Sequence, residues 1–162
     1  MKNPNNTCCF TGHRALSREE IFSLSPRLMS AVLSLYEQGY RHFVAGGALG
    51  FDTLAATMIL RMKPKYPDLT LTLVFPCADQ TRGWAAADIA RYEALRAEAD
   101  EVICLAPAYF NGCMRVRNQR MVDMSRACIA YVTHARSGSA QTMNMATRAG
   151  HTVINLGDGA QR

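Results

Sequence analysis

The glycine-rich turn at residues 46–50 contains the residue types that proteins use to hold a phosphate group. It follows the apolar run 43–45, which predicts a strand, and precedes residues 54–62, which predict a helix. Backbone N–H groups and the positive end of the helix dipole would then face one concavity, which suits an anion. The glycines that would allow this close approach are Gly46, Gly47 and Gly50. A turn that only connects the strand to the helix is an equally good interpretation.

This turn differs from two well-known phosphate-binding motifs. Ala45 stands where the G-x-G-x-x-G fingerprint has its first glycine, although Gly47 and Gly50 fit that pattern. No Gly-Lys-Ser/Thr follows, so the turn is not a Walker A loop either. The residue types therefore predict a small polar ligand without identifying it.

Charged and aromatic side chains in the segments that follow the expected strands could contact such a ligand. Arg14 is a fork donor suited to phosphate or carboxylate, and a solvated surface charge is the alternative. His13 could act as an acid or base, but hydrogen bonding within its loop is favoured. Asp52 either caps N–H groups at the helix start or accepts a hydrogen bond from a ribose hydroxyl. Trp84, the only tryptophan, either stacks on a base or anchors its loop.

A second expected helix start offers further hydroxyl and N–H groups to a ligand. Its candidate residues are Ser137, Gly138, Ser139 and Thr142. Ser139 is also a candidate N-cap of that helix, which would be a purely structural role. Five methionines, Met114, Met121, Met124, Met143 and Met145, are expected to be core or helix-packing residues.

The elements that must position these residues alternate along the whole chain. Expected strands are residues 7–11, 43–45, 69–75, 101–105, 128–132 and 152–156. A capping box at Ser17 and Glu20 is expected to start the first helix and Gly39 to end it. The other expected helices are residues 54–62, 85–99, 115–125 and 137–148. This order predicts a single three-layer α/β domain over residues 1–162, with a mostly parallel sheet and helices on both faces. Residues 1–6 and 158–162 are expected to be frayed.

Four polar or glycine-rich segments each follow an expected strand: residues 12–14, 46–52, 77–84 and 137–142. Parallel sheets bind ligands outside the carboxyl ends of their strands, where the strand order reverses. All four segments are therefore expected at one edge of the sheet. This convergence favours ligand binding more strongly than any single motif does.

Composition narrows the class of protein. The chain is 49% apolar with a net charge of +5, which fits an anionic ligand, but its eighteen basic residues are scattered, so nucleic acid is not the expected partner. No apolar run approaches the ~20 residues needed to span a bilayer. The N-terminus also lacks the apolar core of a signal peptide, which favours a cytoplasmic protein without a membrane anchor.

The six cysteines predict neither a disulfide framework nor a metal site. Cys8, Cys9, Cys104 and Cys128 lie in apolar runs, where a reduced thiol packs as a small hydrophobe. No C-x-x-C pair is present, so no zinc site is expected. Cys77 and Cys113 lie in expected loops and would be the more exposed pair.

With these segments assembled, the chain resembles the YpsA-like branch of the SLOG superfamily, which also holds the DprA/Smf and LOG (lysine-decarboxylase-like) proteins. The resemblance runs from Thr11-Gly12-His13-Arg14 to Ile154 and includes residues 46–52, Pro76, Gln80, Trp84, Tyr92-Glu93, residues 112–114, Arg117-Asn118, residues 121–123 and residues 138–140. It implies a Rossmann-like fold and a pocket for a nucleotide or nucleotide-derived ligand. It also implies that Gln80, Arg117 and Asn118 belong to that pocket.

The LOG proteins, which remove the base from nucleoside monophosphates, have a motif that this chain only partly matches. Arg117-Asn118 resembles the arginine-lysine pair of the LOG motif. Thr142 stands where the catalytic glutamate of P-G-G-x-G-T-x-x-E would be, and threonine supplies no carboxylate to an oxocarbenium-like transition state. Asp52, Asp79 or Glu93 could substitute from another segment.

The sequence therefore favours a ligand-responsive module that binds a nucleotide or an ADP-ribose-type molecule, with no certain cofactor. Hydrolysis of a nucleotide N-glycosidic or phosphate bond is the alternative, and single-stranded DNA binding of the DprA kind is a weaker one. Assembly into a homo-oligomer is left open.

Overall fold

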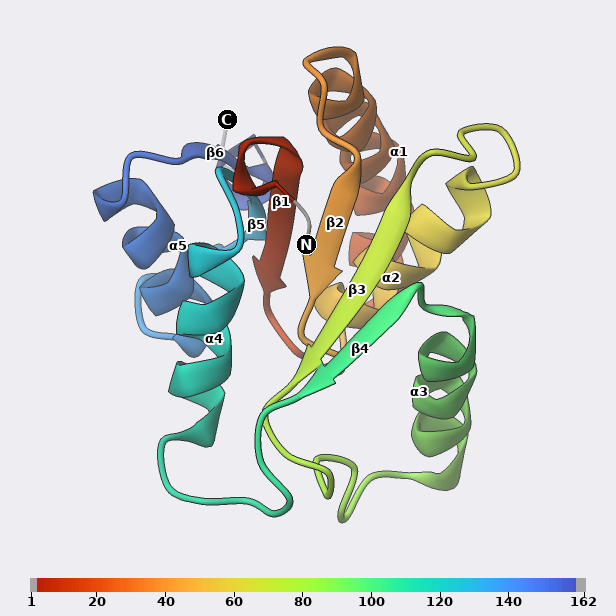
Figure 1. Ribbon diagram of the computed structural model, residues 1–162, viewed down its shortest axis with the longest axis vertical. Helices are drawn as coiled ribbons and strands as arrows, with labels where there is room; N and C mark the ends of the chain where they lie inside the picture. The colour runs from red at the N-terminus through yellow and green to blue at the C-terminus, as the bar shows by residue number, and fades with distance from the viewer. Residues whose placement is uncertain (1–2, 160–162) are drawn as a thin grey trace.

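Six parallel strands form one sheet in the computed structural model, which describes residues 3–159 (Figure 1). In chain order the strands are β1 Thr7–Gly12, β2 His42–Ala45, β3 Thr70–Phe75, β4 Glu101–Cys104, β5 Ala127–Tyr131 and β6 Thr152–Asn155. Their order across the sheet is β4-β3-β2-β1-β5-β6, and each neighbouring pair is parallel. The prediction of a three-layer, Rossmann-like α/β domain is confirmed.

Helices connect the strands and cover both faces of the sheet (Figure 1). They are α1 Arg18–Glu37, α2 Phe51–Met62, α3 Ala86–Glu98, α4 Cys113–Asp123, α5 Gly138–Arg148 and the short α6 Leu156–Gly159. Helix α2 begins three residues before the expected position, because Gly50 takes a positive φ of 76° and turns the chain directly into the helix.

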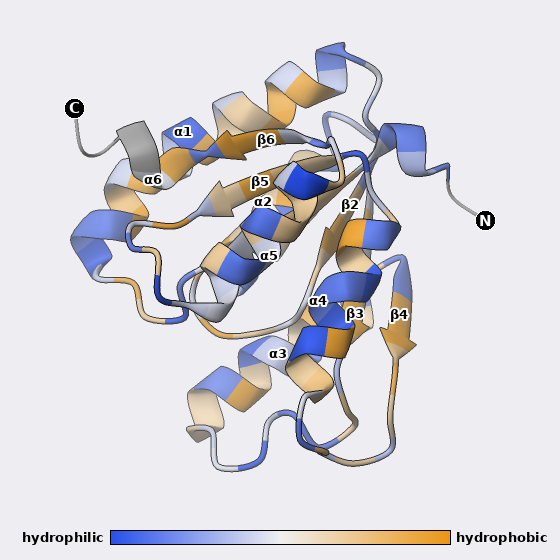
Figure 2. Cartoon of the chain, turned by 90° about the vertical axis from the view of Figure 1, so that its left-hand side faces the viewer, coloured by the Kyte–Doolittle hydropathy of each residue, from blue (hydrophilic) through white to orange (hydrophobic). Residues whose placement is uncertain are grey.

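The two faces of the sheet bury two separate apolar clusters, because successive strand residues point to opposite sides. On one face, Phe10, Phe43 and Phe51 pack together, with ring centroids 5.7 and 6.2 Å from that of Phe10. Helices α1, α2 and α3 cover this face. On the other face, small side chains such as Cys9 and Cys128 pack under α4 and α5. Helix α4 is mostly hydrophilic (Figure 2), so it contacts the sheet through a narrow apolar stripe.

The first helix starts as expected. The Ser17 Oγ accepts a hydrogen bond from the Glu20 N–H, and the Glu20 Oε1 accepts one from the Ser17 N–H, each at 3.0 Å. Gly39, with φ of 102°, follows the end of the helix. Tyr131 on β5 donates a further hydrogen bond to Glu20 at 2.6 Å, which ties the start of α1 to the sheet.

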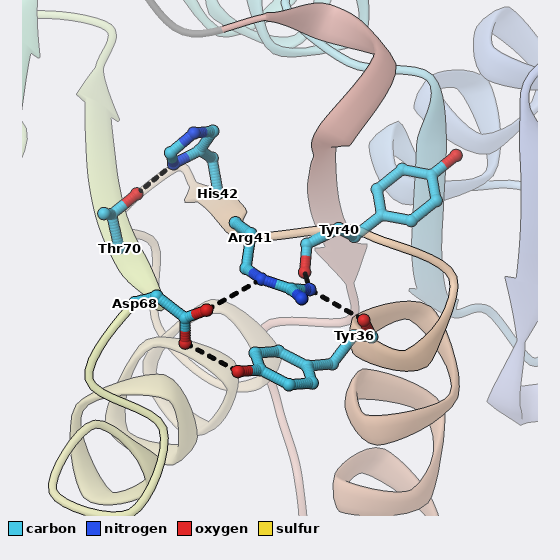
Figure 3. A network of polar contacts seen from close by, with 6 residues as sticks. All are labelled: Tyr36, Tyr40, Arg41, His42, Asp68 and Thr70. Carbon is cyan, nitrogen blue, oxygen red and sulfur yellow. Dashed lines mark hydrogen bonds and ion pairs between the residues drawn. The ribbon is translucent and has the colours of Figure 1, made fainter.

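A polar network closes the amino ends of β2 and β3, at the edge opposite the four glycine-rich and polar segments (Figure 3). The Arg41 guanidinium lies 3.8 Å from the Tyr36 ring centroid and donates to Asp68 at 2.9 Å. It also donates to the carbonyls of Tyr36, in the last turn of α1, and of Tyr40, in the connection that follows. The Tyr36 hydroxyl donates to Asp68 at 2.7 Å, and this bond lowers the pKa of the Asp68 carboxyl. These contacts fix the chain between α1 and the sheet.

The chain ends and the cysteines differ from expectation. Residues 3–6 are ordered rather than frayed: the Asn3 side chain caps the 3-10 turn Pro4–Asn6, and the Arg41 N–H donates to the Asn6 carbonyl. Residues 158 and 159, also expected to be frayed, belong to α6, and residues 1–2 and 160–162 lie outside the described part of the chain. Cys104 is exposed because β4 is an edge strand. Cys77 and Cys113 are both buried: Cys77 lies in a covered loop, and Cys113 is not in a loop but is the first residue of α4.

Candidate functional site

A cavity of about 280 Å³ lies outside the carboxyl end of β1, where the strand order reverses between β1 and β5. We call it the switch-point cavity. All four segments that the sequence placed at this edge contribute to its walls, and α4 supplies the remaining side. Open α/β sheets bind ligands at this position, because the connections on either side of the reversal diverge and leave a crevice.

Ten of the residues singled out in the sequence line the switch-point cavity: Gly12, His13, Arg14, Asp52, Gln80, Arg117, Asn118, Ser137, Gly138 and Ser139. Sequence reasoning missed Met114, which is only partly buried, whereas Met121 is 2% exposed and packs in the core as expected, although it also borders the cavity. Their spacing from Arg117 by three and four residues puts all three side chains on one face of α4. That spacing was the available signal.

Gly46, Gly47 and Gly50, the three glycines of the turn between β2 and α2, do not line the cavity. Their role is to allow close packing around the turn. Gly47 has φ of 73°, and a Cβ there would lie 2.5 Å from the Phe75 ring. A Cβ at Gly50 would meet the carbonyl oxygen of Arg14. A Cβ at Gly46 would lie 2.5 Å from the Arg117 Nη1 and 2.9 Å from the Asp52 Oδ2. These glycines therefore let other backbone segments and side chains of the protein pack closely against the turn.

Trp84 and Thr142 also lie outside the cavity lining. Trp84 packs edge-on against Tyr92, with ring centroids 5.5 Å apart, and joins the core under α3. The Thr142 hydroxyl is buried and donates to the Gly138 carbonyl at 3.0 Å. The N-cap of α5 is Ser137 rather than Ser139: its Oγ accepts from the Ala140 N–H at 3.0 Å.

Arg117 is the buried cation of the site, with 6% of its surface exposed. Its Nη1 donates to the Gly46 carbonyl at 2.5 Å, and its Nε donates to the Asn118 Oδ1 at 2.8 Å. Burial lowers the pKa of Arg117, and the nearby Asp52 carboxylate opposes that shift. An arginine stays charged under such a shift, so the cavity holds a fixed positive group.

Asp52 lies on the other side of Gly46 and is equally buried. Its Oδ2 accepts a hydrogen bond from the Ala48 N–H at 3.2 Å. Burial raises the pKa of this carboxyl, while the positive charge of Arg117 and hydrogen bonds from the turn lower it. Asp52 therefore faces the cavity as a carboxyl group in a poorly solvated position beside a cation.

Gln80 also lines the cavity, and one polar atom of its side chain has no hydrogen-bond partner among residues 3–159. Its Nε2 donates to the Gly46 carbonyl at 3.4 Å, so that carbonyl accepts from both Gln80 and Arg117. Its Oε1 is buried and has no hydrogen-bond partner among residues 3–159. Buried polar atoms are nearly always paired in folded proteins, so an unpaired one at a cavity wall is consistent with a ligand donor there.

His13 is held by the loop that follows β5. Its Nε2 accepts a hydrogen bond from the Thr133 N–H at 2.9 Å, and its ring stacks on His134 with centroids 4.4 Å apart. Burial lowers the pKa of His13, and the neighbouring His134 lowers it further. The imidazole is therefore neutral near pH 7, with its proton on Nδ1, and it positions the loop as the sequence favoured.

Residues 3–159 contain neither a metal-binding cluster nor a membrane-spanning helix. No three side chains of His, Cys, Asp or Glu lie close enough together to hold a metal ion in that part of the chain. None of the helices described combines the length and the apolar character that crossing a membrane requires.

Proteins similar to this chain include two bacterial relatives. The SPbeta prophage-derived protein YoqJ of Bacillus subtilis (strain 168) is 29% identical over 152 residues, which cover 84% of this chain and 88% of YoqJ. A UPF0398 protein of Bacillus cereus (strain B4264) is 26% identical over 110 residues. That match covers 67% of this chain and 60% of the relative, so this chain spans well under the full length of the B. cereus protein.

The fold is similar to that of DNA processing protein A (DprA) from Streptococcus pneumoniae, with a TM-score of 0.66 at 18% identity. The similarity covers 92% of this chain and 49% of DprA, so this chain spans about half of that protein. A family model described as the YspA SLOG family (YpsA) matches residues 9–152, which is most of the chain. The chain therefore belongs to the YspA SLOG family.

Proposed function

We propose that the chain binds a nucleotide or a nucleotide-derived small molecule in the switch-point cavity and acts as a ligand-responsive module. The observation that carries this proposal is the meeting of all four polar segments around one cavity whose wall holds a buried arginine. A volume of about 280 Å³ lies just below the ~300 to 1,000 Å³ that is typical of ligand pockets, so the cavity has room for at most a single nucleoside phosphate.

The start of α5 is the best seat for the phosphate. Ser137 caps the Ala140 N–H and leaves the N–H groups of Gly138 and Ser139 without partners among the described residues. The helix dipole adds a favourable field at this end, and the unpaired Gln80 Oε1 gives an independent sign of a ligand in the same cavity. At the start of α2, by contrast, the Asp52 carboxylate repels a phosphate and suits a sugar hydroxyl or base N–H.

Gly138 offers a sharp test of the phosphate seat. A Cβ at this position meets nothing within 4 Å, so a larger side chain can be accommodated. Gly138→Asp places a negative charge beside the phosphate, and a carboxylate in the first turn also suits the helix dipole, so the fold is kept. Gly138→Asn has nearly the same shape without the charge.

Calorimetric titration with nucleosides and nucleoside monophosphates separates the outcomes. We expect Gly138→Asp to lose monophosphate binding by at least about tenfold, because an anion now faces an anion, while Gly138→Asn keeps most of it. Equal binding by Gly138→Asp and the wild type would refute the phosphate seat. Failure of the wild type to bind any nucleotide in the panel would refute the proposed function.

The position of Asp52 in the cavity supports a second candidate function, hydrolysis of the bound nucleotide. Of the three carboxylates that could replace the glutamate absent at Thr142, only Asp52 lines the cavity; Asp79 and Glu93 do not. A carboxylate with a raised pKa beside a bound sugar could activate water for attack at the anomeric carbon. Release of free base from nucleoside monophosphates, abolished in Asp52→Asn, would establish this activity. Binding without base or phosphate release would leave the module as a sensor.

A further inference from the structure

A second and larger cavity, of about 770 Å³, lies on the other side of the loop that follows β1. It runs between that loop, the first turn of α1, one side of α2 and the first turns of α3. We call it the α2 groove. Helices α1, α2 and α3 cover the same face of the sheet (Figure 1), so the groove is built from elements that the fold already holds together.

The α2 groove and the switch-point cavity share Arg14, which lines both. The backbone beside it is fixed, because the Phe51 N–H donates to the His13 carbonyl at 3.0 Å and Gly50 leaves no space for a Cβ against Arg14. The exposed Arg14 side chain therefore stands where a ligand passing from one cavity to the other would lie.

The groove has an apolar floor and a basic rim. Leu16, Leu49 and Leu54 are partly buried and line it. Arg61 and Arg91 line it farther along α2 and α3. Residues 50, 53, 57 and 61 form one stripe of α2, about 16 Å long at 1.5 Å per residue. This length leaves room for a ring and a sugar beyond Arg14.

The groove is lined by three arginines, Arg14, Arg61 and Arg91, and by two carboxylates, so its net charge is positive. The Glu20 carboxylate accepts from the Ser17 N–H and the Tyr131 hydroxyl, and Asp88 pairs with Arg91 at 3.5 Å. Among residues 3–159, neither Arg14 nor Arg61 has an acidic partner within 4.0 Å. Unpaired arginines beside an apolar floor suit a molecule that joins ring systems to phosphate groups.

We propose that the α2 groove binds the second half of a dinucleotide whose first half occupies the switch-point cavity. Arg14 bonds the linking phosphates, the leucine floor contacts the second base or sugar, and Arg61 binds polar groups at the far end. This proposal depends on the proposed function, because the first half must be seated in the switch-point cavity. It narrows the ligand class from a single nucleotide to two nucleosides joined through phosphate groups.

Calorimetry with matched ligands tests the groove: AMP against diadenosine diphosphate, and GMP against diguanosine diphosphate. Arg61→Gln removes the far charge from an exposed helix position, and Arg96→Gln on α3 is its control, because Arg96 is exposed but does not line the groove. We expect at least one dinucleotide to bind about tenfold more tightly than its mononucleotide. Arg61→Gln should weaken only the dinucleotide, by about fivefold, because a charged hydrogen bond is lost in a partly solvated position. Arg96→Gln should change neither.

The outcomes distinguish this proposal from the proposed function. If AMP or GMP binds but the dinucleotides bind no more tightly, or if Arg61→Gln weakens both ligands of a pair equally, the groove subsite is wrong and the proposed function stands. If none of the four ligands binds, both proposals are wrong.

Discussion

Arg117 connects three parts of the site through one guanidinium group. It donates to the Gly46 carbonyl and the Asn118 side chain, and its charge stabilises the buried Asp52 carboxylate. A guanidinium held in this way has few donors left for a ligand, so most phosphate contacts should come from the start of α5. The main role of Arg117 is then to keep a carboxylate ionisable inside the fold.

Arg117→Ala should therefore reduce stability strongly. The substitution leaves Asp52 as a buried carboxylate without its neighbouring cation, and removing one member of such a pair costs about 3 kcal/mol. Arg120→Ala, at an exposed position of the same helix, should change the free energy of unfolding by about 0.5 kcal/mol or less. Urea denaturation measures both, and similar small losses for the two variants would contradict this role.

Asp52 should also give stability a distinct pH dependence. Burial raises the pKa of its carboxyl above the ordinary 3.8, so the folded state holds the proton more tightly than the unfolded state. The stabilisation from this proton is complete at a pH below the pKa of the unfolded state, and it is lost as the pH rises through the pKa of Asp52 in the folded state. Asp52→Asn cannot titrate, so the wild type should lose stability relative to this variant as the pH rises above the ordinary pKa of 3.8. A constant difference over this rise in pH would show that the pKa is not raised.

At the scale of elements, the turn between β2 and α2 shows what its glycines do. Gly47 and Gly83 both have positive φ, but a Cβ at Gly47 strikes the Phe75 ring, whereas a Cβ at Gly83 meets nothing within 4 Å. A residue with a side chain would therefore be strained by the positive φ at either position, but only at position 47 would it also clash with the Phe75 ring.

Alanine at the two glycines should separate these effects. Gly83→Ala should cost about 1 kcal/mol from backbone strain alone. Gly47→Ala should cost about 2 kcal/mol or more, because the buried Phe75 ring must also move. Thermal or urea unfolding of the two variants provides the comparison. Equal losses would mean that the Phe75 contact does not limit the turn.

Local sequence signals predicted the elements well where one interaction decides the structure. The Ser17–Glu20 capping box and the run that forms β3 involve neighbouring residues only, so the chain shows them directly. The predictions of side-chain exposure were wrong where tertiary packing determines exposure. Cys104 lies in an apolar run but on an edge strand, and Cys77 lies in a loop that is nonetheless covered. Neither the strand order nor the path of a loop can be derived from local spacing.

The candidate site shows the same division between local and non-local information. The order of strands and polar segments was enough to bring ten expected residues to one cavity. The roles within it depend on non-local contacts, so the sequence could not show that Gly47 packs on Phe75 or that Trp84 packs on Tyr92. The α2 groove was missed entirely, because its walls come from three helices far apart in the sequence.

At the scale of the whole molecule, the reversal of strand order at β1 determines where a ligand can lie. Connections diverge on the two sides of β1, and α4 and α5 on one face and α2 on the other leave the switch-point cavity between them. The polar network around Arg41 closes the opposite edge of the sheet (Figure 3). Similarity to the DprA fold extends over nearly the whole chain, but a shared fold does not determine function.

The most direct test of the central claim is an NMR titration of the ¹⁵N-labelled protein with AMP and GMP. One ligand shared by four segments should shift the amide signals of Gly12, Ala48, Gln80 and Ser139 together, with a single dissociation constant. The amides of Arg41 and Thr70 at the opposite edge should not shift. Shifts confined to one segment, or larger at the Arg41 edge than at the cavity, would contradict a shared site.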